Sequence, residues 1–184
     1  ILSAEKTNAA GDNGDNFGTS VAIHGDTIIV GSPNAGVSTD GRVVVFARTG
    51  QDTWCQVCPI GDPDCAFNQP DGQGTVDDDF GHAVAFDGTT LVVGAPKADF
   101  SGFADAGAAY VFSRSFGEEL NDPCDDVFEF QRTLQPSTKE ASSNFGLTVD
   151  IVGTTTVVGH PKFNTTVADG GAIYVFEGSD QTAD

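Results

Sequence analysis

Residues 16–33 read NFGTSVAIHGDTIIVGSP, and this pattern returns twice in the chain. The second copy, DFGHAVAFDGTTLVVGAP, covers 79–96, and the third, NFGLTVDIVGTTTVVGHP, covers 144–161. From the Phe to the final Pro is 16 residues in every copy, 17 to 33, 80 to 96 and 145 to 161. Self-similarity at a fixed long period indicates a repeat architecture in which each copy is one supersecondary unit.

Each copy predicts a meander of short strands. Alternating apolar residues predict a first strand, Gly-containing turns predict a tight hairpin, and near-continuous apolar runs predict a second strand buried on both faces. A Gly-x-Pro then ends the second strand, since Pro lacks the N–H that a ladder needs. The predicted strands are, copy by copy, 19–23, 27–31, 42–46 and 54–60; 82–86, 90–94, 108–112 and 128–134; and 147–151, 155–159 and 172–176.

Four-stranded antiparallel units in tandem predict an all-β fold, a β-propeller with about three blades present. The expected divisions are 1–15 (strand 4 of a preceding blade, at 1–4, and a linker), 16–78, 79–143 and 144–184, the last lacking its fourth strand. Three blades do not close a ring, because about four is the minimum. We therefore expect a partial propeller, or one closed by further sequence or by another chain. Two chains exchanging the strand at 1–4 would give six blades.

The Phe-Gly pairs at 17–18, 80–81 and 145–146, with Gly-x-Pro at 31–33, 94–96 and 159–161, resemble FG-GAP repeats. They resemble the blades of the integrin α-subunit propeller, and more closely the FG-GAP proteins secreted by bacteria and algae. The resemblance implies a six- or seven-bladed propeller in an extracellular protein. It also implies adhesion, ligand recognition or scaffolding instead of catalysis.

Integrin-type blades carry a calcium loop between strands 1 and 2, and this chain departs from that pattern. Its corresponding connections are tight turns at 25–26, 88–89 and 153–154, which are too short for several oxygen ligands. The family's calcium sites are therefore not carried over. No cofactor is assigned, and calcium dependence stays open.

The composition is strongly acidic, with 27 Asp and Glu against 8 Lys and Arg and a net charge of −19. Nucleic-acid binding needs a basic footprint, so we expect no nucleic-acid partner. Attachment to an anionic membrane surface is disfavoured, and no stretch is long and apolar enough for insertion. The charge suits high salt, divalent cations or cationic partners, and equally serves solubility alone.

Four cysteines, Cys55, Cys58, Cys65 and Cys124, predict two disulfides and an oxidising compartment. Spacing does not choose among the three pairings, although Cys124 could link one blade to its neighbour. A zinc site is the rival, because Cys55 and Cys58 are spaced C-x-x-C, but a second close pair is missing. Asn164 begins an N-glycosylation sequon. The chain begins at Ile1, so we expect a processed product or a piece of a longer chain, secreted or at the cell surface.

The loops between strands 2 and 3 and the connections between blades should emerge on one face, which we call the loop face. It should be acidic, and aromatic side chains there could stack on sugars or anchor a protein. The alternatives are that the carboxylates cap turns and that the rings fold back on the blade. The candidates are Asp12, Asp15, Asp40, Asp77, Asp78, Asp99, Phe100, Phe103, Asp105 and Asp169, with Asp12, Asp15, Asp77 and Asp78 as weak metal-ligand candidates.

The sequence predicts no catalytic residues. His24, His82 and His160 occupy three different repeat positions, which favours packing or surface roles, and no nucleophile, zinc-protease or P-loop motif is present. Phe17, Phe80 and Phe145 recur in phase and are predicted to be core residues. We expect a non-catalytic extracellular module for protein or glycan binding, adhesion or structural assembly. The alternative is the accessory propeller of a larger secreted enzyme, a lyase or phospholipase, whose catalytic residues lie elsewhere.

Overall fold

The structure is a computed structural model that describes residues 14–35, 40–58, 66–70, 77–116 and 122–178. Within these ranges the chain forms three antiparallel sheets and one 3-10 turn, η1 (Pro123–Asp125). The expected strand at 1–4 lies outside the described residues. The strands are β1 (Ser20–His24), β2 (Thr27–Ser32), β3 (Arg42–Gly50), β4 (Thr53–Val57), β5 (Ala83–Phe86), β6 (Thr90–Ala95), β7 (Ala108–Ser115), β8 (Val127–Leu134), β9 (Val149–Val152), β10 (Thr155–His160) and β11 (Ala172–Glu177).

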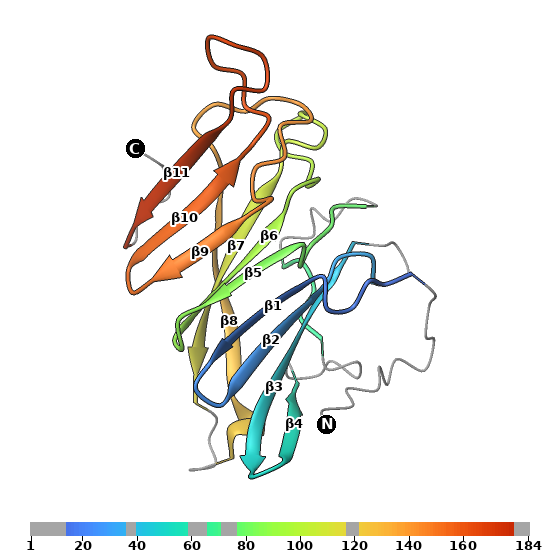
Figure 1. The fold of residues 1–184 in the computed structure, drawn as a ribbon, viewed down its shortest axis with the longest axis vertical. Coiled ribbons are helices and arrows are strands. Elements are labelled where there is room, and N and C mark those ends of the chain that lie inside the picture. The colour runs from blue at the N-terminus through green and yellow to red at the C-terminus, as the bar shows by residue number, and fades with distance from the viewer. Residues whose placement is uncertain (1–13, 36–39, 59–65, 71–76, 117–121, 179–184) are drawn as a thin grey trace.

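Each sheet is one copy of the repeat, folded as a meander. The strand orders are β1-β2-β3-β4, β5-β6-β7-β8 and β9-β10-β11, and every neighbouring pair is antiparallel. We call these sheets blade 1, blade 2 and blade 3. Figure 1 shows them packed in chain order, with the first strands β1, β5 and β9 lying along one another. The predicted all-β fold, a partial β-propeller of about three blades, is confirmed.

Blade 2 is covered on both faces, and this sandwich holds the core. Its leading face, which is turned toward blade 1, carries Phe86, Leu91 and Tyr110 in one buried cluster with Ile29 and Val43 of blade 1. This packing explains why the second strands are apolar at consecutive positions: alternate side chains must serve two different interfaces.

The trailing face of blade 2, which is turned toward blade 3, builds the second buried cluster. Val92 and Val111 meet Ile151, Val158 and Phe176 there. By repeat alignment, Val84 and Phe86 of blade 2 correspond to Val149 and Ile151 of blade 3 and to Val21 and Ile23 of blade 1. A position in the repeat therefore fixes whether a side chain faces the preceding or the following blade.

The Phe-Gly pair joins one blade to the next through the main chain. Phe80 forms a parallel bridge with Gly41, and Phe145 forms the same bridge with Gly107. The Phe80 N–H donates to the Asp40 carbonyl at 2.9 Å, and the Phe145 N–H donates to the Ala106 carbonyl at 3.0 Å. The two junctions between blades therefore share one geometry.

The prediction that all three repeated Phe residues are core residues is wrong for Phe17. Phe80 and Phe145 are fully buried, whereas Phe17 is 38% exposed. The reason is its place in the repeat: among the described residues, no sheet covers the leading face of blade 1. Val21 and Ile23 on that face are exposed for the same reason.

None of the helical segments among the described residues is long and apolar enough to cross a membrane.

Candidate functional site

A disulfide joins blade 1 to blade 2. Cys55 in β4 is bonded to Cys124 in η1, the 3-10 turn before β8, with Cα atoms 5.8 Å apart. The expected link between neighbouring blades is thus present, and Cys55 lies in β4, within the fourth strand predicted at 54–60. A cross-link over 69 residues is worth about 2–4 kcal/mol. Cys58 is also disulfide-bonded, and Cys65 lies outside the described residues.

Next to the disulfide, a charged pair holds strands of blade 2 together. The Arg114 guanidinium pairs with the buried carboxylate of Asp126, the residue directly after η1. The Arg114 guanidinium also lies over the ring of Phe86, 6.0 Å from its centroid. This ion pair explains the buried Asp126 as a structural residue.

On the loop face, the first two blades bring several carboxylates together. The pKa of Asp40 is raised by its partial burial and by the charge of Asp77. Lys97 pairs with Asp79 at 3.0 Å, and this hydrogen bond, with further negative charges nearby, raises the pKa of Lys97. One lysine therefore offsets part of a local excess of negative charge.

Two of the predicted loop-face residues are buried turn residues. Asp15 is 4% exposed and Asp78 is fully buried. The Asp15 carbonyl accepts from the Ser32 hydroxyl at 2.8 Å, and the Asp78 carboxylate accepts from the Gln69 amide at 3.0 Å. Asp77 lies on the exposed side of this turn, while Asp12 is outside the described residues. The described residues include no group of three His, Cys, Asp or Glu side chains placed to hold a metal ion.

The loop between β6 and β7 carries four of the candidates. The Asp99 carboxylate accepts from the Asp105 N–H at 2.9 Å, and so caps the loop from within. Phe100 and Phe103 pair through two main-chain hydrogen bonds. Phe100 packs against the core, whereas Phe103 is 41% exposed. The ring that is free for a ligand is therefore Phe103.

The corresponding loop of blade 3 places Asn164 and Asp169 together. The Asn164 main-chain and side-chain N–H groups both donate to one Glu140 carboxylate oxygen at 2.9 Å. The Asn164 side-chain oxygen accepts from the Asp169 N–H at 3.1 Å. Asn164 is exposed, so the sequon is accessible, but its amide has a partner in this conformation.

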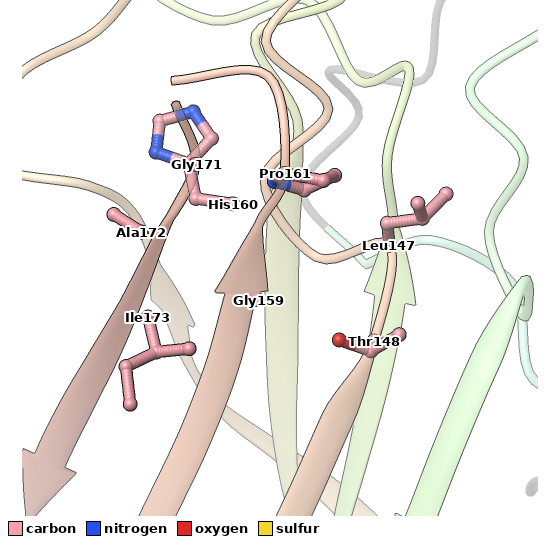
Figure 2. Close-up of a pocket in the computed structure, with 8 residues that line it drawn as sticks. All are labelled: Leu147, Thr148, Gly159, His160, Pro161, Gly171, Ala172 and Ile173. Atoms are coloured by element: carbon pink, nitrogen blue, oxygen red, sulfur yellow. The ribbon is translucent and has the colours of Figure 1, made fainter. Parts of the chain in front are cut away.

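An open pocket lies on the trailing face of blade 3, at the end of the sheet where β10 finishes. Its volume is about 430 Å³. Figure 2 shows that β10, β11 and the residues entering β9 line it, with the Thr148 hydroxyl directed toward β10. The lining residues are Leu147, Thr148, Gly159, His160, Pro161, Gly171, Ala172 and Ile173.

His160 lies at this pocket and is fully buried. Its ring stacks on Phe163 at 5.0 Å and meets Phe145 edge-on at 5.5 Å. Neither ring nitrogen has a hydrogen-bond partner among the described residues. Burial lowers the pKa of His160, and the charge of Glu140 opposes the shift only in part. Its role here is packing, as the sequence favoured.

The residues of this pocket were not among the sequence candidates. Alignment of the repeats would have located the pocket. In that alignment, Thr148, Gly159 and Gly171 of blade 3 are equivalent to Ser20, Gly31 and Gly41 of blade 1, in that order. In blade 1 those positions receive the Phe-Gly pair of blade 2. Comparing the copies position by position, instead of looking for polar clusters, would have found it.

Comparison with known proteins agrees with this architecture. A search of curated proteins found no match. The family profile described as FG-GAP repeat matches residues 7–46, 71–112 and 128–176, which together span most of the chain and include strands of all three blades. The chain belongs to the FG-GAP repeat family.

Proposed function

We propose that this chain is a non-catalytic extracellular module whose activity is structural assembly, in which its end blades pack against further FG-GAP blades. The observation that carries the proposal is the exposure of apolar side chains at repeat positions that are buried between blades. Ile23 is 66% exposed on blade 1, but the corresponding Phe86 is 8% exposed. Ile173 is 72% exposed on blade 3, but the corresponding Val43 is fully buried. Exposed apolar faces of this kind mark protein interaction surfaces.

The surroundings of two histidines support a non-catalytic role. His24 meets the ring of Phe86 edge-on, 6.2 Å between centroids, across the junction of blades 1 and 2. His160 is buried among aromatic rings. Both side chains are used for packing, which accounts for their presence without assigning either to proton transfer.

The disulfide and the accessible sequon support an extracellular setting. Disulfides persist in oxidising compartments, and the Cys55–Cys124 bond lies where it holds two blades together. We expect Asn164 to carry a glycan after secretion, since it is exposed in a loop. The net charge of −19 favours protein partners over nucleic acid.

A photo-crosslinking experiment tests the assembly role. p-Benzoylphenylalanine would replace Ile23 in one variant and Ile173 in another, and each would be irradiated with extracellular material of the source organism. The expected cross-linked peptides come from FG-GAP repeats. Placing the same cross-linker at the exposed Val167, in the loop between β10 and β11, is the control. Cross-links only to proteins without such repeats, or no cross-links above the Val167 control, would overturn the proposal.

Binding of a protein or glycan at the loop face is the second candidate, and the exposed ring of Phe103 favours it. Phe103 is 41% exposed within a loop that Asp99 closes from inside. An exposed aromatic ring beside carboxylates suits stacking on a sugar or anchoring a basic segment. Saturable binding to a glycan or peptide array that is lost in Phe103→Ala would support it, and identical binding by the variant would exclude it.

A further inference from the structure

We propose that the pocket on blade 3 is an acceptor site for a Phe-Gly pair, and that its occupant is Phe17-Gly18 of a second copy of this chain. The inference rests on the proposed function, because it treats the end faces as packing surfaces. It goes further by naming the contact and the partner. The three described blades carry three equivalent sites, two of which are filled.

The filled sites show what the repeat is built to receive. At residue 31 a side chain would collide with the Gly81 carbonyl, and at residue 94 with the Gly146 carbonyl. Glycine is therefore required in the second strand because the main chain of the following Phe-Gly pair passes directly over it. The Ser20 hydroxyl completes the first site by donating to the Gly81 carbonyl at 2.8 Å.

Blade 3 repeats this site and leaves it open. Gly159 corresponds to Gly31 and Gly94, yet the nearest atom to a side chain there would be the Thr148 hydroxyl of its own blade. Thr148 corresponds to Ser20, so its hydroxyl is placed to donate to an incoming carbonyl (Figure 2). Gly171 corresponds to Gly41, on which the Phe80 main chain rests in blade 1. The pocket thus has the donor and the two glycines of a filled site.

The matching Phe-Gly pair is preformed at the other end of the molecule. The Gly18 N–H donates to the Gly31 carbonyl at 3.0 Å, as the Gly81 N–H does to Gly94 at 3.1 Å. Gly18 has φ +90°, and Gly81 has φ +89°. No described atom lies within 4 Å of where a side chain on Gly18 would be, and Phe17 is 38% exposed. The pair therefore has its docked conformation without a partner, which lowers the ordering cost of association.

Two carboxylates on the trailing face of blade 3 set the strength of this contact. Asp150 stands where blades 1 and 2 have Ala22 and Ala85, and Glu177 stands where they have Ala47 and Ser113. Covering these groups costs desolvation free energy that the internal junctions do not incur. We therefore infer a reversible contact between chains, and Asp150→Ala should strengthen it.

Sedimentation velocity over a concentration series tests the proposal with three variants. Ile173→Asp alters the pocket wall, Phe17→Asp alters the inserted pair, and Val167→Asp is the control, since all three residues are exposed and the fold should survive. The unaltered chain and Val167→Asp should self-associate, and each site variant should raise the dissociation constant about tenfold or more. An equimolar mixture of the two site variants should recover a heterodimer, because one intact pocket meets one intact Phe-Gly pair.

The outcomes separate this inference from the assembly role. A chain that stays monomeric at every concentration, or site variants that associate as well as the control, would overturn the second copy as occupant. If the cross-linker at residue 173 still captured FG-GAP repeats of another protein, the assembly role would stand without it. Association that is lost in each variant and recovered in the mixture would support both.

Discussion

Phe17 and Phe145 occupy the same position of the repeat, yet one is 38% exposed and the other is fully buried. The ring of Phe145 meets Tyr174 and His160, each at 5.5 Å between centroids, and blade 2 covers it. Phe17 has no described blade before it. The comparison shows that each repeat encodes two packing surfaces, the leading and the trailing face of its blade. Whether the repeated Phe is buried depends on whether a neighbouring blade covers the leading face.

Truncating the two phenylalanines should give the largest difference. We expect Phe145→Ala to lower the free energy of unfolding by about 3–5 kcal/mol, because it empties a buried, ring-filled site between two blades. Phe17→Ala should cost about 1 kcal/mol or less, since much of its ring already contacts solvent. Urea unfolding of the monomer, followed by fluorescence of the single Trp54, measures both. If both variants lost the same free energy of unfolding, Phe17 would not lie on an uncovered packing face.

The glycines of the second strands provide a second version of the comparison. Gly94→Val should lower the free energy of unfolding by about 3 kcal/mol, because its side chain would meet the Gly146 carbonyl of blade 3. Gly159→Val should cost about 1 kcal/mol or less, since the Thr148 hydroxyl in its way lies at the end of a side chain that can rotate. Thermal unfolding of the two variants at low protein concentration measures the difference. A cost at Gly159 as large as that at Gly94 would mean that the glycine serves blade 3 itself.

Much of this fold was predictable from sequence, because one pattern repeats three times and its Gly and Pro residues punctuate every strand. The second strands begin at their predicted positions and end one residue later than predicted, since a hairpin glycine precedes each apolar run. The exposure of Phe17 was not predictable from its own copy, because burial there depends on a neighbouring sheet. The burial of Asp78 was missed because an Asp in a turn motif looks like a surface residue, whereas here its carboxylate accepts from the Gln69 amide and its carbonyl accepts from the Lys97 N–H.

The candidate site was harder to predict, because its defining residues have little chemical signature. The loop carboxylates were predicted as candidates because of their charge. In the structure, however, Asp15 and Asp78 are buried, and Asp99 closes its own loop. Gly159 and Thr148 are ordinary residues that acquire meaning only through their equivalents in blades 1 and 2. In a repeat protein, a site is found by asking which repeated contact lacks its partner.

His160 gives the smallest expected effect and concerns the same junction. Its equivalents are Ser32 and Ala95, so blade 3 alone buries a titratable group there. Because burial lowers the pKa of folded His160, the unfolded chain binds a proton more readily once the pH falls below about 6.5. Above that pH, His160 should therefore make no pH-dependent contribution to stability. As the pH falls from about 6.5 toward the lowered pKa of folded His160, stability should decrease.

The apparent melting temperature at pH 7.5 and 5.5 tests this, with His160→Ala as the matched variant because blade 2 carries Ala95 at that position. Between pH 7.5 and 5.5, the apparent melting temperature should decrease less in His160→Ala than in the unaltered chain. This comparison does not depend on the absolute stability of the variant. His24→Ala is the control, since His24 is exposed at the hairpin of blade 1. Glu140 and Tyr174 lie close enough to influence His160, so Glu140→Gln should enlarge the drop by removing the charge that favours the protonated ring. If the drop were the same with and without His160, proton uptake at other groups would account for it, and the buried imidazole would not link pH to the stability of blade 3.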